Sequence, residues 1–209
     1  MPEPTDDLYR VQKKDIIKAG TVLADAFQQD PFWKEILESA NFKQRSAFFE
    51  SPVKYCLKYG EVYAPSEKLQ GIAAWVPCKF ADMTMWRALS CGSFNSIMKM
   101  GMKMARQSMQ MQTIFEPLEV ERRNNMKGRQ YLYLIIIGVA SEFQGQRLGN
   151  KMLKSLIRKS EQAEIAIYLE TPTERNVKMY EKLGFRVLSK VDLPIVNLPQ
   201  WGMLREKNP

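Results

Sequence analysis

The stretch YLYLIIIGVASEFQGQRLG, residues 131–149, decides the fold of this chain. Leu132–Val139 is a near-continuous run of branched and aromatic side chains, which predicts a central strand covered on both faces. An amphipathic helix is predicted after Gly149, because apolar residues recur on one face: Met152, Leu153, Leu156 and Ile157. A strand that turns into a helix presents free backbone N–H groups, which suit a pyrophosphate. We therefore expect an anion site at the turn Gln144–Gly149.

A second strand and a second helix follow this turn. Ile165–Leu169 predicts the strand, Thr173 is placed to cap the helix, and Gly184 lies where a helix C-cap is expected. The helix carries Asn176 and Tyr180. A dinucleotide-binding Rossmann fold is disfavoured, because it requires a Gly-x-Gly-x-x-Gly directly after the first strand.

The remaining ordered elements are predicted from alternation, caps and turn residues. Asp30-Pro31 interrupts the first helix, since proline disfavours helix at the residue before it. In order, we expect an edge strand at Leu8–Val11, a helix capped by Asp15, a helix over Gln44–Tyr59, a hairpin of Glu61–Ala64 and Gln70–Val76, and a terminal pair of strands at Phe185–Val191 and Trp201–Leu204.

Residues 81–126 differ in composition from the rest of the chain. Eight of the thirteen methionines fall between Met83 and Met111, together with Trp86. The spacing predicts one or two helices that pack on the sheet. Methionine also adapts to irregular spaces, so a deformable acceptor pocket is a second interpretation, and both can hold. Arg122–Arg129 is polar and predicts an exposed loop.

The composition is that of one globular domain. The chain has 209 residues, of which 45% are apolar and 26% charged, and such a domain buries roughly 70% of its unfolded surface. No apolar run approaches the roughly 20 residues that span a bilayer, and Met1–Asp7 lacks the regions of a secretory signal. We expect a single cytoplasmic domain over residues 1–209 with no membrane partner.

Three widely spaced cysteines and no histidine give no metal-ligand pattern. Cys56, Cys78 and Cys91 are predicted to be reduced, mostly buried thiols, and no metal is expected. The formal charge of +8 is dispersed along the chain. A nucleic-acid adaptor would need a tighter basic stripe and strongly salt-dependent binding, so no nucleic-acid partner is expected. A phosphate-rich ligand accounts for part of the excess charge.

Taken together, the two strand–helix units resemble the GNAT N-acetyltransferase superfamily. The family pattern Gln/Arg-x-x-Gly-x-Gly/Ala is matched by Gln144–Gly149, except that Arg147 replaces the first motif glycine. Arginine tolerates helical dihedral angles, so we expect it not to distort the turn; it can contact phosphate or crowd it. The resemblance implies an α/β fold with a mixed, mostly antiparallel sheet flanked by helices. It places the acyl-CoA core at about residues 131–188 and the acceptor-side helices at about 81–126.

The resemblance also implies acetyl-CoA as co-substrate and assigns residues to it. The Val139 N–H is the expected donor to the thioester carbonyl. The assigned residues are Ile137, Gly138 and Val139 along the pantetheine arm, Gln144, Gly145, Gln146, Arg147, Leu148, Gly149 and Asn150 at the pyrophosphate turn, Asn176 on the pantetheine, and Lys182 and Arg175 as phosphate contacts.

Acetyl transfer to an amine sets the catalytic expectations. Tyr180 lies where the family keeps its proton-donating tyrosine, and it is our candidate acid for the leaving thiolate. A histidine base is excluded, because the chain has none. Glu170, after the second strand, is our candidate base, Glu142 is the second choice, and water can also carry the proton away. No cysteine stands in a nucleophile motif, so we expect direct transfer without an acyl-enzyme.

A narrower resemblance is to the puromycin N-acetyltransferase-like branch. It rests on Tyr168–Pro172, Arg175-Asn176, Tyr180–Phe185 and Trp201-x-Met203, with looser agreement at Asp30–Phe32 and Gly71–Pro77. This branch implies an amine acceptor, and we expect a small-molecule amine. A protein lysine or N-terminus is the alternative acceptor, and a non-catalytic acyl-CoA-binding module, motivated by Arg147, is the alternative to an enzyme. A homodimer is among the assemblies that the sequence leaves open.

Overall fold

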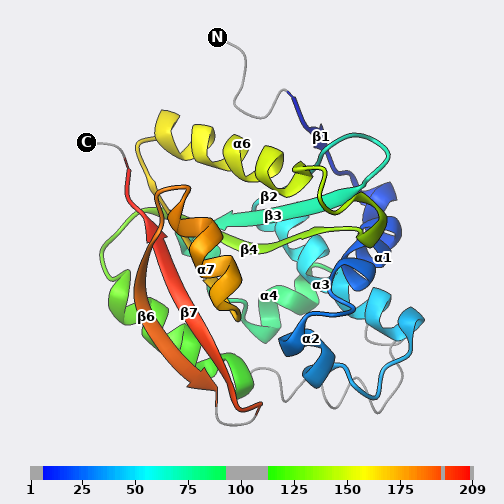
Figure 1. The fold of residues 1–209 in the computed structure, drawn as a ribbon, viewed down its shortest axis with the longest axis horizontal. Helices are drawn as coiled ribbons and strands as arrows, with labels where there is room; N and C mark the ends of the chain where they lie inside the picture. Colours follow the sequence, from blue (N-terminus) through cyan, green and yellow to red (C-terminus); the bar gives the residue numbers. More distant parts are fainter. Residues whose placement is uncertain (1–6, 93–112, 194–195, 208–209) are drawn as a thin grey trace.

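A computed structural model describes residues 7–92, 113–193 and 196–207. Within them the strands form a seven-stranded sheet in the order β1-β2-β3-β4-β5-β7-β6 (Figure 1). Neighbouring strands are antiparallel except β4 and β5, which are parallel. The predicted mixed, mostly antiparallel sheet is confirmed. The strands are β1 Tyr9–Arg10, β2 Glu61–Ala64, β3 Gly71–Pro77, β4 Tyr131–Val139, β5 Ala166–Thr171, β6 Arg186–Leu193 and β7 Leu198–Arg205.

Helices cover both faces of this sheet. The helices are α1 Ile16–Ala26, α2 Pro31–Ile36, α3 Phe42–Tyr59, α4 Met85–Ser90, a helix over residues 113–125, α6 Leu148–Gln162 and α7 Glu174–Glu181. One buried cluster joins α1 and α3 to the sheet, and another joins α6 and α7 to it. Figure 1 shows α6 along one side of the central strands and α1 and α3 on the other. No helix of the described part of the chain is long and apolar enough to cross a membrane.

Local sequence explains where several helices begin. The Asp30 side chain accepts from the Phe32 and Trp33 N–H groups, with Pro31 at the first helical position of α2. Thr173 caps α7 as predicted, accepting from the Asn176 N–H. The prediction that Asp15 caps α1 is wrong. Its carboxylate instead accepts from the Gln12 N–H and the Tyr9 hydroxyl within a 3₁₀ turn, Lys13–Asp15.

The segment predicted as an exposed loop, Arg122–Arg129, begins inside a helix. The helix over residues 113–125 continues to Asn125, and both Arg122 and Met126 are buried. The polar composition misled the prediction, because it hid a stripe spaced by four residues that includes Ile114 and Leu118. Residues 93–112 lie outside the described residues, so the methionine-rich acceptor pocket stays a prediction.

Strand β4 is covered on both faces, as its apolar run predicts. Leu132 and Leu134 pack with α6, whereas Tyr133 and Ile136 pack toward α1 and α3. Ala74 pairs with Ile136 but Trp75 pairs with Leu134, which leaves Ile135 as an extra residue in β4. Such a bulge bends a strand and re-aims the side chains beyond it.

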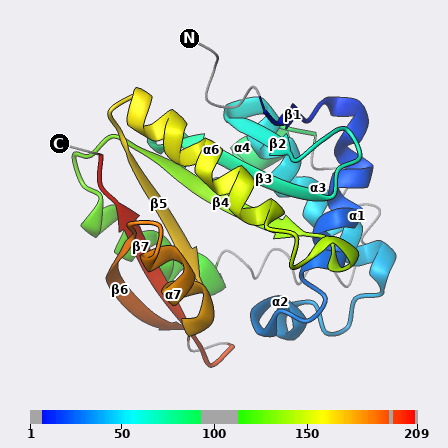
Figure 2. The ribbon, with the colours of Figure 1, turned by 45° about the horizontal axis from the view of Figure 1, so that its top comes forward.

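Strands β4 and β5 part beyond Leu134. They pair from Tyr131–Ala166 to Leu134–Leu169. After that point β4 continues along β3 to Val139, and β5 continues along β7 to Thr171. Figure 2 shows the two strands diverging. The divergence frees one edge of the second half of β4, so backbone N–H and C=O groups there are available to a ligand.

Candidate active site

The turn between β4 and α6 is held near the end of β4 by two side chains. The Gln144 side-chain amide donates to the Val139 carbonyl at 3.1 Å. Asp25, near the C-terminus of α1, accepts from the Ser141 N–H at 2.6 Å and from the Ser141 hydroxyl at 3.0 Å. Gly145 has a φ of +81°, and a Cβ there would meet nothing within 4 Å. The turn is therefore fixed at its base and open on its outer side.

Arg147 adopts a backbone conformation that usually belongs to glycine. Its φ is +61° and ψ is 17°, in the left-handed region, directly before α6. The expectation of helical dihedral angles at this residue is wrong. An L-residue in this region costs roughly 1–2 kcal/mol, so the arginine is kept at an unfavourable position of the motif. Its side chain is exposed.

The residues of this turn fit an anionic group. Helix α6 has 15 residues, and Arg147 supplies no side-chain cap to its first N–H groups. Gly149 lies in the first turn, where even a Cβ would keep 3.7 Å from Val139 Cγ2. Open space, free N–H groups and the positive end of the helix dipole suit a phosphate. Gln146, Arg147 and Asn150 are exposed around it, and Leu148 is half-buried.

Helix α7 buries Tyr180 and exposes the two candidate phosphate contacts. Tyr180 is 5% exposed and packs on Phe185 with ring centroids 5.5 Å apart. Burial raises the pKa of Tyr180 well above its ordinary value, so the phenol holds its proton at neutral pH. Among the described residues its hydroxyl has no hydrogen-bond partner in the structure. Asn176 is half-buried one turn earlier, and Arg175 and Lys182 are exposed.

The end of α7 follows the predicted pattern. Gly184 has a φ of +83°, and the Phe185 N–H donates to the Tyr180 carbonyl at 3.1 Å. A left-handed glycine with this bond closes a helix and satisfies a terminal carbonyl. The closure fixes Tyr180 in the last turn, directly against the sheet.

Glu170 lies inside β5, where it pairs with Gly202, rather than after the strand as predicted. Its Oε2 accepts a short hydrogen bond from the Tyr133 hydroxyl of β4. Its Oε1 is buried and has no hydrogen-bond partner within the described chain. Burial raises the pKa of Glu170, against the opposing effects of the Arg122 charge and the Tyr133 and Tyr168 hydroxyls. A raised carboxyl pKa makes the carboxylate a stronger base.

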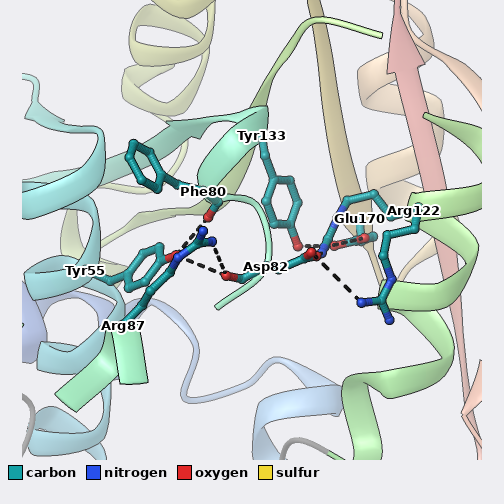
Figure 3. A network of polar contacts seen from close by, with 8 residues as sticks. Tyr55, Phe80, Asp82, Arg87, Arg122, Tyr133 and Glu170 are labelled. Atoms are coloured by element: carbon teal, nitrogen blue, oxygen red, sulfur yellow. Dashed lines mark hydrogen bonds and ion pairs between the residues drawn. The ribbon is translucent and has the colours of Figure 1, made fainter. Parts of the chain in front are cut away.

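The residue that the sequence analysis missed is Arg122. Its Nη1 lies 3.7 Å from Glu170 Oε1, and its Nη2 donates to Asp82 Oδ1 at 2.8 Å. Its guanidinium also lies 4.6 Å from the centroid of the Tyr133 ring. Figure 3 shows Arg122, Tyr133 and Glu170 gathered at one place. A signal was present in the sequence, since Arg122 occupies an otherwise apolar helical stripe and must find a partner there.

Glu170 and Tyr180 lie on opposite faces of the sheet. Leu169 and Glu170 are consecutive in β5, so their side chains point to opposite sides. Tyr180 shares a buried cluster with Leu169, whereas Glu170 contacts Tyr133, which packs on the other face. Glu170 directly follows Leu169, the last residue of β5 that pairs with β4, and Tyr180 belongs to the buried cluster on the other face that includes Leu169. An acid and a base on opposite sides suit a reaction in which one group loses a proton and another gains one.

Other candidate groups lie away from this point. Glu142 is exposed in a 3₁₀ turn, Ser141–Phe143. Cys56 is buried, whereas Cys78 and Cys91 are partly exposed, and all three are free thiols. In the part of the chain that the structure describes, no three metal-ligating side chains gather at one place.

Comparison with known proteins adds a family match for part of the chain and a fold for nearly all of it. Residues 113–185 match the family described as Acetyltransferase (GNAT) family. An uncharacterized N-acetyltransferase of Schizosaccharomyces pombe is 26% identical over 210 residues, covering 94% of this chain and 82% of the yeast protein.

Solved structures resemble the whole chain. A histone acetyltransferase HPA2 and related acetyltransferase from Corynebacterium glutamicum has a TM-score of 0.62 at 19% identity, covering 97% of this chain and 96% of its own. Arylalkylamine N-acetyltransferase 2 from Aedes aegypti has a TM-score of 0.64 at 11% identity, covering 96% and 98%. At such identities the likeness shows the fold alone.

The matched residues include the turn between β4 and α6, Tyr180, and the buried pair of Arg122 and Glu170. The yeast relative and the solved structures extend the likeness over nearly the full chain. Sequence, fold and site therefore agree: residues 113–185 are similar to the GNAT family, the chain has a GNAT-like fold, and these findings support an acyltransferase.

Proposed function

We propose that this chain transfers an acetyl group from acetyl-CoA to the primary amine of a small molecule by direct attack. The observation that carries the proposal is the Glu170 carboxylate, held beside the point where β4 and β5 part, with one oxygen free of hydrogen bonds. A buried acceptor without a partner is costly, because its desolvation is not repaid. A substrate N–H would supply the missing partner.

The geometry of the turn and of β4 supports the residues that we propose to hold acetyl-CoA. The Gln144–Asn150 turn supplies N–H groups for the pyrophosphate, and Arg147, Arg175 and Lys182 supply exposed charges. The free edge of Ile137–Val139 supplies backbone groups for the pantetheine arm. The family resemblance assigns Asn176 to the same arm. When bound, acetyl-CoA supplies a thioester carbonyl and a thiolate leaving group.

The chain's own groups divide the proton transfers between them. Glu170 accepts a proton from the amine, since burial raises its pKa and so makes its carboxylate a stronger base. Tyr180 retains its proton because burial raises its pKa, so it can donate to a leaving thiolate. Cys56 cannot serve as a nucleophile, since complete burial raises the pKa of its thiol. Cys78 and Cys91 are partly exposed but stand in no nucleophile motif, so the proposed transfer is direct, without an acyl-enzyme.

The acceptor class rests on the narrower resemblance. The stretch Tyr168–Phe185 supports a branch similar to puromycin N-acetyltransferase, and through it an amine acceptor. The same stretch does not specify puromycin. Arylalkylamine N-acetyltransferase 2 is among the proteins that share the fold, which makes an arylalkylamine a suitable first probe. A single domain over residues 1–209, a cytoplasmic location and a homodimer stay predictions of the sequence.

The test has two steps. Calorimetric titration with acetyl-CoA is expected to show one-to-one binding. Thiol release is then measured with phenethylamine, diaminobutane and a lysine-containing peptide, against a blank without amine. Faster release with either small amine supports the proposal, and release with the peptide alone favours a protein acceptor. Binding without release from any amine contradicts an enzyme and favours a binding module.

A further inference from the structure

Arg122 is buried as deeply as a core residue. It is 2% exposed, on the helix over residues 113–125, yet it carries a full charge. Removing an arginine from water costs several kcal/mol in practice, so such a residue requires charged partners. Its partners are the carboxylates of Asp82 and Glu170. They come from the segment between the 3₁₀ turn Cys78–Phe80 and α4, and from β5.

The two partners are held differently. Asp82 receives a hydrogen bond of 2.8 Å from Nη2, whereas the nearest Glu170 oxygen is 3.7 Å from Nη1. A distance of 3.7 Å is too long for a hydrogen bond, but charge still acts strongly over it. Arg122 Nε is also buried without a hydrogen bond among the described residues. Arginine–carboxylate pairs frequently close into two parallel hydrogen bonds, and this pair does not.

This arrangement has a consequence for Glu170. One oxygen is fixed by Tyr133, and the other faces a positive charge that does not occupy its lone pairs. We propose, on the basis of the proposed function, that Arg122 is a positioning residue that keeps Glu170 ionised while leaving Oε1 free for the substrate amine. The hydrogen bond to Asp82 holds the Arg122 guanidinium 3.7 Å from Glu170 Oε1, and the guanidinium packs against the Tyr133 ring.

The proton and bond changes balance. The amine nitrogen forms a bond to the acetyl carbon as the carbon–sulfur bond breaks. One amine proton passes to Glu170 Oε1, and Tyr180 gives one proton to the thiolate. Water then returns a proton to Tyr180 and removes one from Glu170. Arg122 exchanges no proton in this sequence, because a guanidinium stays charged throughout.

Within residues 7–92, 113–193 and 196–207, four other titratable groups act on Glu170. Tyr133 faces it from β4, Tyr168 from β5, and Arg122 and Glu119 act from the helix over residues 113–125. Tyr133 and Tyr168 have pKa values raised by burial, so both keep their protons, and the Tyr133 hydroxyl donates to Glu170 Oε2. Glu119 raises the pKa of Glu170, whereas Arg122 lowers it. Loss of the Arg122 charge would therefore raise the pKa of Glu170 further.

The test compares three variants. Arg122→Met removes the charge and keeps much of the volume. Arg122→Lys keeps the charge but loses the planar guanidinium and its several N–H donors. Arg123→Met is the matched control, since Arg123 is the next residue, is 52% exposed, and lies 3.9 Å from Asp82. The protonation of Glu170 is followed by carbon NMR of glutamate-labelled protein, with the signal assigned through Glu170→Gln. The dependence of kcat/KM on pH is measured alongside.

We expect Arg122→Met to raise the midpoint of the Glu170 NMR titration by about one to three pH units. The acid limb of the pH profile of kcat/KM should move upward by the same amount. Arg122→Lys should stay within about one unit of the parent, and Arg123→Met should match it. An unchanged NMR midpoint in a folded Arg122→Met variant would overturn the proposal. If that variant unfolds, a lysine variant with the midpoint of the parent but a shifted acid limb overturns it equally. An inactive parent would contradict the proposed function instead, while the NMR midpoint still decides the role of Arg122.

Discussion

At the scale of single residues, burial decides how the two candidate catalytic groups hold protons. Glu170 and Tyr180 are acids whose charged forms are disfavoured by desolvation, so the pKa of each is raised. For Glu170 the raised pKa favours accepting a proton from the substrate amine. For Tyr180 it favours keeping a proton until a thiolate is formed. The same physical cause therefore prepares one residue as a base and the other as an acid.

Glu170→Gln should remove the base and retain the shape. We expect kcat/KM to fall by about 10²- to 10⁴-fold, while acetyl-CoA affinity stays close to that of the parent. In the parent, activity should fall as pH drops through a Glu170 pKa above the ordinary value of about 4.3, because a protonated carboxyl cannot accept a proton. Steady-state rates across pH check both statements. A glutamine variant with the parent's rates at all pH values would remove Glu170 from the chemistry.

Tyr180→Phe should separate catalysis from stability. The ring keeps its packing against Phe185, and in the described structure the hydroxyl has no hydrogen bond to lose. We expect the melting temperature to stay near that of the parent and kcat to fall by about 10²-fold or more. Thermal melting and thiol release measure the two effects. Full turnover in the phenylalanine variant would show that water or another group protonates the thiolate.

At the scale of elements, the turn before α6 combines a favourable charge with an unfavourable backbone. Arg147 is held at a φ of +61°, where glycine would carry no penalty. Its exposed guanidinium can reach a phosphate, which offers a reason to keep the side chain. Backbone and charge can be tested separately, because alanine and glycine differ in the conformation they tolerate.

Arg147→Ala keeps the backbone penalty and loses the charge, whereas Arg147→Gly loses both. We expect both variants to bind acetyl-CoA more weakly, by roughly 2- to 10-fold, as for an exposed charge-assisted contact of about 0.5–1.5 kcal/mol. Only the glycine variant should gain stability, by up to about 1 kcal/mol. Calorimetry and urea unfolding measure these quantities. Unweakened binding by Arg147→Ala would show that Arg147 does not contact the phosphate.

The elements themselves were largely predictable from sequence. The strand Leu132–Val139 and the hairpin at residues 61–76 follow from β-branched runs and turn residues, which act over short distances. The buried helical face at Arg122 was not predicted, because charge on that segment suggested solvent. Its burial depends on Asp82 and Glu170, which lie 40 and 48 residues away in the sequence. Such long-range pairing cannot be read from local composition.

At the scale of the whole molecule, the sheet separates two layers of helices. Helices α1 and α3 pack on the face that carries Glu170, and α6 and α7 pack on the other. Helices α1 and α3 pack closely, because Gly20 lets the two backbones approach. A Cβ at Gly20 would lie 2.6 Å from the Ser46 carbonyl oxygen. The relative placement of Tyr180 and Glu170 could not be predicted from the sequence, because, like the burial of Arg122, it depends on residues far apart in the chain. It requires the order of strands and the alternation of faces in the assembled sheet.

Two glycine-to-alanine changes test this packing as a matched pair. Both residues are helical, where alanine is favoured by up to about 1 kcal/mol. At Gly149 the new Cβ makes an ordinary contact of 3.7 Å, so Gly149→Ala should stabilise. At Gly20 a backbone oxygen must move, so Gly20→Ala should destabilise by about 1–3 kcal/mol. Urea unfolding compares the two, and equal stability changes would contradict the close approach of α1 and α3.

The most direct test of the account follows the acetyl group itself. Acetyl-CoA labelled in its acetyl group is mixed with the protein, with and without phenethylamine or diaminobutane, and protein and small molecules are separated after acid quenching. We predict label on the amine in the presence of the parent, greatly reduced label with Glu170→Gln, and no label on the protein alone. Label that stays on the protein, or no labelled amine from any acceptor, would contradict direct transfer at this site.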